Sequence, residues 1–231
     1  TILVLIFALQ ALPAFAGVCP DELSWECFDA TVILVSRDNE GLFRGLCSAT
    51  ALDSTTLITA AHCLKHQLDG QGSWDLYFDA FKQGDIPSQQ IPSQNGQIPP
   101  NYDPDLTYQD KDPERAEYAH DLGVLRLDTP LSADLHYVPL PSSALQLERD
   151  AVLHRIGFGM RPAGNVRTWV REFFRAFLPP GVAGTLRAAD ASGVAGDSGG
   201  AVYVHAVGEG LTLVAVHSSW DFDAATQEYV S

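Results

Sequence analysis

The sequence predicts an all-β protein with a sandwich or barrel architecture, and two observations support this class. Short runs of β-branched and aromatic residues recur at modest spacing, separated by Gly, Pro, Asn and Asp. Helical periodicity of any length is weak. The chain has 231 residues, of which 46% are hydrophobic, so it is able to bury a substantial core, and wholesale disorder is excluded.

The predicted strands follow one another along most of the chain. They are Thr31–Val35, Leu57–Thr59, Trp74–Phe78, Leu122–Leu127, Ala151–Ile156, Ala201–His205 and Leu211–His217. The best helix candidate is Val166–Leu178. The segment Gln83–Tyr108 is rich in Pro, Gln, Asn and Gly, which predicts one long surface loop within the domain.

The formal net charge is −15, from 14 basic and 29 acidic residues. Nucleic acids and anionic membranes are polyanions that such a chain repels, so we expect it to bind neither. The sequence has no phosphate-binding glycine loop, and we expect no cofactor.

The segment Thr1–Ala16 is typical of a secretory signal peptide. It is uncharged, its apolar run Ile2–Leu9 is too short to span a bilayer, and Ala14-Phe15-Ala16 fits a small-x-small cleavage site. The alternative is a buried core helix or strand. We expect cleavage before Gly17, which leaves residues 17–231 as a secreted protein, extracellular or periplasmic, without a membrane anchor.

Three short segments carry residues suited to nucleophilic catalysis. His62 follows an apolar strand in Thr59–Cys63, Asp121 opens a predicted strand, and Ser198 lies in the glycine-rich segment Gly196–Gly200. A serine hydroxyl needs a base to take its proton, and the base needs a carboxylate that fixes its tautomer. Glycines beside the serine allow backbone N–H groups to point at a developing oxyanion.

Each motif alone has a simpler interpretation: a surface histidine, a turn-forming aspartate or an ordinary glycine-rich loop. Their occurrence together, each beside a strand and in the order His, Asp, Ser, favours a catalytic triad. The order also excludes α/β-hydrolases, which run Ser, Asp, His, and subtilisins, which run Asp, His, Ser.

With these motifs the sequence resembles the chymotrypsin/trypsin family of serine proteases, from about Val32 to Val230. The resemblance implies two six-stranded antiparallel barrels, at about residues 28–130 and 137–231, with the catalytic cleft between them. It implies a serine endopeptidase that works through an acyl-enzyme. Its partners would be protein or peptide substrates and protein inhibitors.

The resemblance also assigns roles to single residues. It makes His62 the general base, Asp121 its orienting acid and Ser198 the nucleophile. The backbone N–H groups of Gly196 and Ser198 match the oxyanion hole. Ser218 matches the serine that hydrogen-bonds the catalytic aspartate and begins the substrate-pairing strand.

The four cysteines allow three pairings, and export makes disulfides permissible. Cys47 and Cys63 match the histidine-loop disulfide of the family. A second bond is then expected between Cys19 and Cys27.

Two substrate preferences stay open. The floor of the family's primary pocket corresponds to Ser192, and this neutral residue favours an apolar or aromatic substrate side chain over Arg or Lys. His217, immediately before Ser218, instead resembles the histidine with which glutamate-specific relatives bind a substrate carboxylate. Trp220 would narrow the pocket.

The Arg/Lys-Ile-Val-Gly-Gly activation site of the family is not present in the sequence. In the family, the N-terminus freed there pairs with the aspartate before the nucleophile, here Asp197, and a buried carboxylate without a partner is costly. Candidate partners are the α-amino group of Gly17 and an internal cation such as Arg187 or Arg161. The alternative function is a catalytically inactive protease-fold binding protein, against which the complete triad argues.

No metal site is predicted. His62 and His66 have the i, i+4 spacing of a helical zinc site, but the accompanying glutamate is absent from the sequence. Asp69, Asp75 and Asp79 resemble the calcium loop of some relatives, and a solvated acidic loop is the favoured interpretation.

Overall fold

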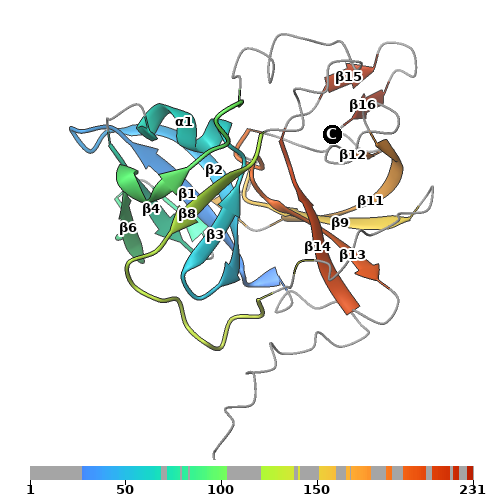
Figure 1. The fold of residues 1–231 in the computed structure, drawn as a ribbon, viewed down its shortest axis with the longest axis horizontal. Helices are drawn as coiled ribbons and strands as arrows, with labels where there is room; N and C mark the ends of the chain where they lie inside the picture. The colour runs from blue at the N-terminus through green and yellow to red at the C-terminus, as the bar shows by residue number, and fades with distance from the viewer. Residues whose placement is uncertain are drawn as a thin grey trace, which may run out of the picture.

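The computed structural model of the protein is built almost entirely from β-strands, as the sequence predicts (Figure 1). Among the described residues there is one α-helix, α1 (His62–Leu68). The signal peptide and the Cys19–Cys27 bond lie outside the described residues and stay predictions. The structure describes residues 28–68, 72–78, 80–82, 84–102, 121–137, 140, 151–159, 165–166, 168–177, 186–188, 195–206, 210–218, 221–223 and 228–230.

The first half of the chain forms a seven-stranded antiparallel sheet that closes on itself. In spatial order its strands are β6 (Gln89–Pro92), β4 (Ser73–Tyr77), β1 (Thr31–Arg37), β2 (Phe43–Asp53), β3 (Thr56–Thr59), β8 (Gly123–Arg126) and β7 (Gly96–Gln97). The first and last strands of this order, β6 and β7, are joined by the 3-10 turn η2 (Ser93–Asn95). They therefore act as one bent strand, and the sheet is a six-stranded barrel.

The β-branched run of β1 is buried on both of its faces. Val32 and Leu34 belong to the core inside the barrel. Ile33 and Val35 belong to a second cluster that includes Phe158 from the C-terminal half. A strand that is covered on both faces is continuously apolar rather than alternating, which explains the sequence of β1.

Among the residues that the structure describes in the C-terminal half, the main element is a five-stranded antiparallel sheet, and the second six-stranded barrel stays a prediction. In spatial order the strands of this sheet are β12 (Leu186–Ala188), β11 (Thr168–Phe177), β9 (Val152–Gly157), β13 (Ala201–Ala206) and β14 (Gly210–Val216). Two smaller pairs are also described: β5 (Ala80–Phe81) with β10 (Asn165–Val166), and β15 (Asp221–Asp223) with β16 (Glu228–Val230). Because β5 comes from the first half and β10 from the second, their pairing ties the halves together.

The two halves also share an apolar cluster, which lies where they meet. Phe28 and Ile58 from the first half and Ile156 and Tyr203 from the second belong to this cluster. The ring centroids of Phe28 and Tyr203 are 5.5 Å apart, and the Tyr203 hydroxyl lies 3.2 Å from that of Thr31. The halves are therefore packed against each other as one body along this contact.

The seven predicted strands correspond to β1, β3, β4, β8, β9, β13 and β14, with ends shifted by up to two residues. The helix predicted over Val166–Leu178 is wrong, because the segment holds β10 and β11. Residues 168–173 pair one by one with β9. Aromatic and β-branched residues dominate this stretch, and pairing with β9 overrides the weak helical spacing of its apolar residues.

The loop predicted over Gln83–Tyr108 is wrong in its centre, where β6, η2 and β7 lie. The apolar side chain of β6 is Ile91, which is buried, and the strand ends at Pro92. Main-chain pairing with β4 and β8 makes this stretch a strand, and a side-chain pattern with one apolar residue does not reveal it. Strand β2 and helix α1 have no counterpart among the sequence predictions.

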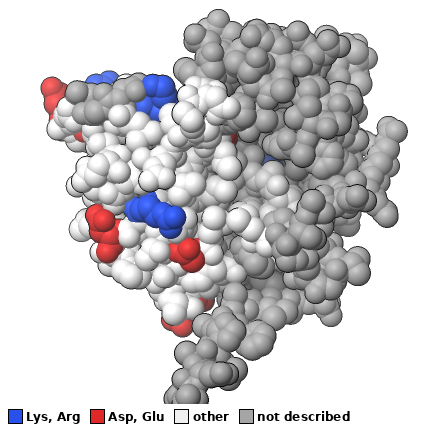
Figure 2. Space-filling view, in the orientation of Figure 1, with Lys and Arg blue, Asp and Glu red and all other residues white. Residues whose placement is uncertain are grey.

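The described part of the face in Figure 2 carries basic and acidic side chains close to one another, with uncharged surface around them. Among the described residues, no helix has the length and apolar character needed to cross a membrane.

Candidate active site

Asp121 holds His62 at two points. His62 is the first residue of α1, which begins shortly after β3, and Asp121 lies just before β8. Strands β3 and β8 are paired, with Thr59 opposite Gly123, so the two residues meet at the same end of the sheet. The backbone N–H of His62 donates to Asp121 Oδ1 at 2.9 Å, and His62 Nδ1 lies 2.8 Å from Asp121 Oδ2.

These contacts fix the state of the imidazole. The Asp121 carboxylate accepts hydrogen bonds and does not donate when ionised, so His62 Nδ1 carries the proton. Nε2 is then the acceptor nitrogen of the neutral ring, which is the state that a general base requires.

Asp121 is almost fully buried. Burial by itself raises the pKa of Asp121, but the hydrogen bonds and charge of His62 and the hydrogen bond from Ser218 outweigh it and hold this pKa below its usual value. The carboxylate is therefore ionised at neutral pH. It is placed to stabilise a positive charge on His62.

Ser218 connects the acid to the serine of the glycine-rich turn. Its hydroxyl donates to Asp121 Oδ2, and its carbonyl oxygen accepts from Ser198 Oγ at 3.3 Å. The structure thus brings together Asp121, His62, Ser198 and Ser218. In proteins without bound substrate, hydrogen bonds of catalytic groups are often long and tighten on binding.

Two glycines allow the turn around Ser198. Gly196 has φ +100° and Gly199 has φ +80°, backbone conformations that residues with a side chain rarely adopt. A Cβ atom on Gly199 would also lie 2.0 Å from Thr59 Oγ1 and 2.2 Å from the carbonyl oxygen of Ser48. The turn therefore packs directly against the first barrel.

Ser48 of β2 is the residue of the first barrel that binds this turn. Its N–H donates to the Ser198 carbonyl oxygen at 2.7 Å, and its hydroxyl donates to the Gly196 carbonyl oxygen at 2.9 Å. The sequence predictions assign no role to Ser48, which directly follows Cys47 of the predicted disulfide.

Asp197, directly before Ser198, is buried beside an arginine. Arg155 Nη1 lies 3.9 Å from Asp197 Oδ2, and the N–H of Gly159 donates to Asp197 Oδ1 at 2.7 Å. The sequence prediction named Arg187 and Arg161 as internal cations and missed Arg155. The available signal was a charged residue inside the predicted strand Ala151–Ile156, two positions before Gly157.

Arg155 also contacts His217. Arginine only donates, so Arg155 Nη1 donates to His217 Nδ1, at 3.3 Å, and the proton of the neutral ring is on Nε2. Burial, followed by the positive charge of Arg155, lowers the pKa of His217 to about 3. His217 is therefore neutral at physiological pH.

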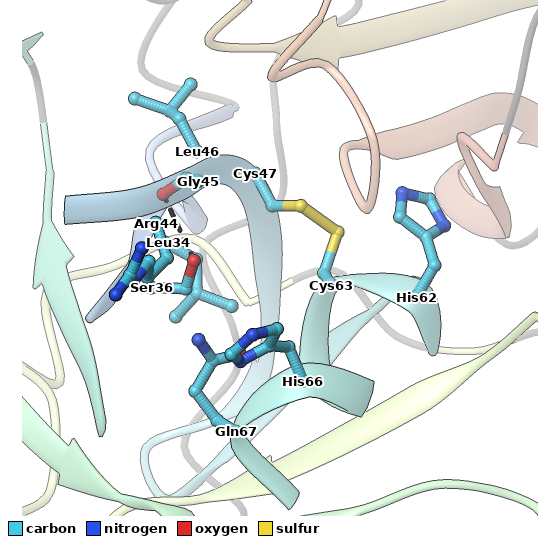
Figure 3. Close-up of a pocket in the computed structure, with 10 residues that line it drawn as sticks. All are labelled: Leu34, Ser36, Arg44, Gly45, Leu46, Cys47, His62, Cys63, His66 and Gln67. Atoms are coloured by element: carbon cyan, nitrogen blue, oxygen red, sulfur yellow. Dashed lines mark hydrogen bonds between the residues drawn. A yellow bond between two sulfur atoms is a disulfide. The ribbon is translucent and has the colours of Figure 1, made fainter. Parts of the chain in front are cut away.

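The bond between Cys47 and Cys63 is present and joins β2 to the start of α1. A recess of about 220 Å³ lies beside it and is lined by His62, Arg44 and His66 among others. In Figure 3 the disulfide lies between the His62 ring and the lining residues of β2. The bond thus anchors the segment that carries His62.

Some of the other candidate residues lie outside the described residues, and these include Asp69 and Asp79. The placements of Ser192 and Trp220 lie outside the described residues, so the structure does not describe the floor of the substrate pocket. Among the residues of the calcium-loop alternative, Asp75 is buried and ion-paired with Arg37, which makes it part of the barrel structure. His66 is exposed on α1, outside the His62–Asp121 pair.

The arrangement suits nucleophilic catalysis. An ionised buried carboxylate holds an imidazole whose Nε2 is the acceptor nitrogen, and the serine lies in a turn that two glycines with positive φ shape. The contacts gather a carboxylate, an imidazole and a serine hydroxyl, the residue types that an acyl-transfer reaction uses.

Comparison with known proteins agrees with this geometry. A family model described as Trypsin matches residues 30–231. The solved structure of HL collagenase superposes with a TM-score of 0.64 over 90% of this chain and 89% of that chain, at 18% sequence identity. At this identity the likeness shows a shared fold, the chymotrypsin-like arrangement. A search of curated proteins by sequence found no match.

The low pKa of His217 predicts acid sensitivity. Folded His217 stays neutral down to about pH 3, whereas the unfolded chain protonates it below about pH 6.5. The unfolded state binds more protons between these values. The free energy of unfolding therefore decreases as the pH is lowered, by up to about 1.4 kcal/mol per pH unit. Urea unfolding at pH 4.5 to 6.5 measures this slope, which His217→Gln should flatten.

The glutamine side chain of this variant would keep an acceptor for Arg155, and it is not protonated in this range. His66→Gln is the matched control, because the His66 ring is exposed. An equal slope in the wild type and in His217→Gln would contradict the neutral, buried state of His217.

Proposed function

The chain belongs to the trypsin family of serine proteases, and we propose that it is a secreted endopeptidase whose triad is Ser198, His62 and Asp121. Its substrates are proteins or peptides. The observation that carries the proposal is the two-point hydrogen bonding of His62 by the buried Asp121. This pairing orients the ring as a base and stabilises its protonated form. Secretion is supported by the character of residues 1–16 and by the Cys47–Cys63 bond, since disulfides persist in oxidising compartments.

In the first half of the reaction, His62 Nε2 takes the proton of Ser198 Oγ as the oxygen attacks the carbonyl carbon of the substrate. Negative charge develops on the carbonyl oxygen. The N–H groups of Gly196 and Ser198 receive it, while Asp121 stabilises the imidazolium. The carbon–nitrogen bond then breaks, the leaving amine takes the proton from His62, and an acyl-enzyme remains.

Water completes the cycle through the same groups. His62 takes a proton from the water, the hydroxide attacks the acyl carbon, and Ser198 leaves with that proton. The recess beside the Cys47–Cys63 bond is lined in part by His62, the residue that protonates the leaving amine in this mechanism. We assign it to the substrate residues that follow the cleaved bond.

The turn around Ser198, residues 196–200, is called the nucleophile turn below. Its working conformation depends on a cation beside Asp197. We assign this role to Arg155, which is buried next to the carboxylate and belongs to β9. The alternative is the α-amino group of Gly17. Arg155 needs no conformational insertion to reach Asp197, which favours it.

The preferred residue before the cleaved bond is apolar or aromatic, or glutamate, and not Arg or Lys. Ser192 supplies no negative charge for a basic side chain. His217 is neutral and Arg155 occupies its Nδ1, so the ring offers a substrate carboxylate one N–H donor without a full charge. A positively charged ring would also attract the carboxylate by Coulomb interaction, and a neutral ring does not. The apolar preference is therefore the first expectation.

Replacement of the nucleophile tests the triad. Ser198→Ala should lower peptide hydrolysis by about 10⁴-fold or more and leave the free energy of unfolding nearly unchanged. Asp121→Asn should lower it by about 10⁴-fold, because it stabilises the wrong tautomer of His62. The exposed Ser132→Ala variant is the control.

A fluorophosphonate probe measures the same site directly. Native wild type should label at Ser198, and heat-denatured protein and Ser198→Ala should not. Wild type that stays folded but labels no better than the denatured protein would support the alternative, an inactive protease-fold binding protein.

The two candidate partners of Asp197 predict opposite outcomes. Arg155→Met should lower the free energy of unfolding by about 3–5 kcal/mol, because it leaves a buried carboxylate without its cation, and it should lower turnover. Adding Asp197→Asn should restore part of the stability by removing that charge. One residue added before Gly17 should leave turnover unchanged. If the added residue inactivates the enzyme and Arg155→Met does not, the N-terminus is the partner.

Substrate preference is measurable with peptides that differ at one position. Peptides carrying Phe, Leu, Glu or Arg before the cleaved bond should show kcat/KM for Phe or Leu at least about tenfold above that for Arg, since Ser192 carries no charge. If Glu is cleaved best, His217→Gln should reduce kcat/KM for Glu far more than for Phe. Arg as the best substrate would exclude the proposed pocket.

A further inference from the structure

Ser48 occupies a fully buried position where the first barrel meets the nucleophile turn. Besides its two bonds to the carbonyls of Ser198 and Gly196, its hydroxyl accepts from the N–H of Phe158 at 2.9 Å. Its own carbonyl oxygen accepts from Thr59 Oγ1 at 2.7 Å. The residue thus joins β2, β3, the end of β9 and the turn.

The direction of the side-chain bonds is fixed. The Phe158 N–H only donates, so Ser48 Oγ accepts there, and its single proton goes to the Gly196 carbonyl oxygen. No other orientation of the hydroxyl satisfies both the Phe158 N–H and the Gly196 carbonyl oxygen. A buried group held in this way is an effective anchor, because losing either bond leaves a buried polar group unsatisfied.

The anchored residues are those whose N–H groups receive the oxyanion in the proposed reaction. Ser198 is held through the backbone N–H of Ser48, a contact that does not depend on the side chain at position 48. Gly196 is held through the hydroxyl, a contact that needs this side chain. Gly196 has φ +100° and the wide conformational freedom of glycine, so without the bond its peptide groups are able to rotate.

We propose that Ser48 is a positioning residue that holds the Gly196 carbonyl and thereby keeps the Gly196 N–H aimed at the oxyanion. The proposal rests on the function proposed above. It assigns Ser48 no contact with the substrate. Its effect falls on the charge that develops in the transition state, so it raises kcat and leaves substrate binding nearly unchanged.

Ser48→Ala removes the hydroxyl and keeps the backbone contact to Ser198. Turnover is expressed per active site, counted with a fluorophosphonate, so that a loss of folded protein does not lower it. Loss of one oxyanion donor costs about 10²–10³ in kcat, and loss of its anchor should cost at least about 10-fold. KM should change by less than about 2-fold, and the Ki of a peptide aldehyde should rise in step with the loss of kcat/KM.

Two further variants separate positioning from stability. Thr50→Val is the matched control, because Thr50 is equally buried in the same strand and its hydroxyl faces Thr31. It should keep wild-type turnover per active site. Ser48→Thr keeps a hydroxyl at the position and should recover most of the turnover that Ser48→Ala loses.

Hydrogen exchange gives a readout that does not require activity. In a Ser198→Ala background, Ser48→Ala should speed amide exchange over residues 196–198, and Thr50→Val should not. Turnover per site within about 2-fold of wild type together with unchanged exchange would overturn the proposal. If the fluorophosphonate counts no active sites in the wild type, but Ser48→Ala still speeds amide exchange, the proposed function would be refuted. The role of Ser48 as an anchor of the Gly196 carbonyl would be supported.

Discussion

One constraint governs the site: a buried carboxylate is costly unless hydrogen bonds or an opposite charge compensate it. Asp121 and Asp197 are both buried. Asp121 is compensated by His62 and Ser218, and Asp197 by Arg155 and the N–H of Gly159. The compensating groups are also the ones that shape the candidate machinery, since His62 is the proposed base and Arg155 lies under the nucleophile turn. The chain therefore satisfies its buried charges and assembles its site by making the same contacts.

The site belongs to neither half of the chain alone. His62 and Asp121 come from the ends of β3 and β8 in the first barrel, whereas Ser198 and Ser218 come from segments next to β13 and β14. The two sets meet beside the cluster that Phe28 and Tyr203 share across the halves. The relative position of the halves thus sets the distance between His62 and Ser198, the proposed base and nucleophile. Displacements of about 1 Å are enough to impair reactions of this kind, so packing far from the chemistry has a direct effect on rate.

The strands that the sequence predicted correctly have a local pattern, and the predicted triad also rests on local motifs. His62, Asp121 and Ser198 each lie in a short motif beside a strand whose residues are apolar or β-branched. Such patterns are recognisable from the sequence without knowing which distant segments pack against them. The parts that failed depend on contacts between distant segments. β11 is a strand because β9 lies beside it, and β6 and β7 are strands because they close the barrel between β4 and β8. The importance of Arg155 comes from its contacts with Asp197 and His217, which lie much further along the chain.

The place of Arg155 in β9 bears on when the protein becomes competent. A cation supplied by a new chain end arrives after a separate cleavage, which gives the producing cell a delay and a trigger. A cation built into a strand is in position as soon as that strand pairs with its neighbours. Under the proposed function, control of such a protein would rest on location rather than timing: export, or a tight inhibitor, would have to separate it from the proteins of its own cell from the moment it folds.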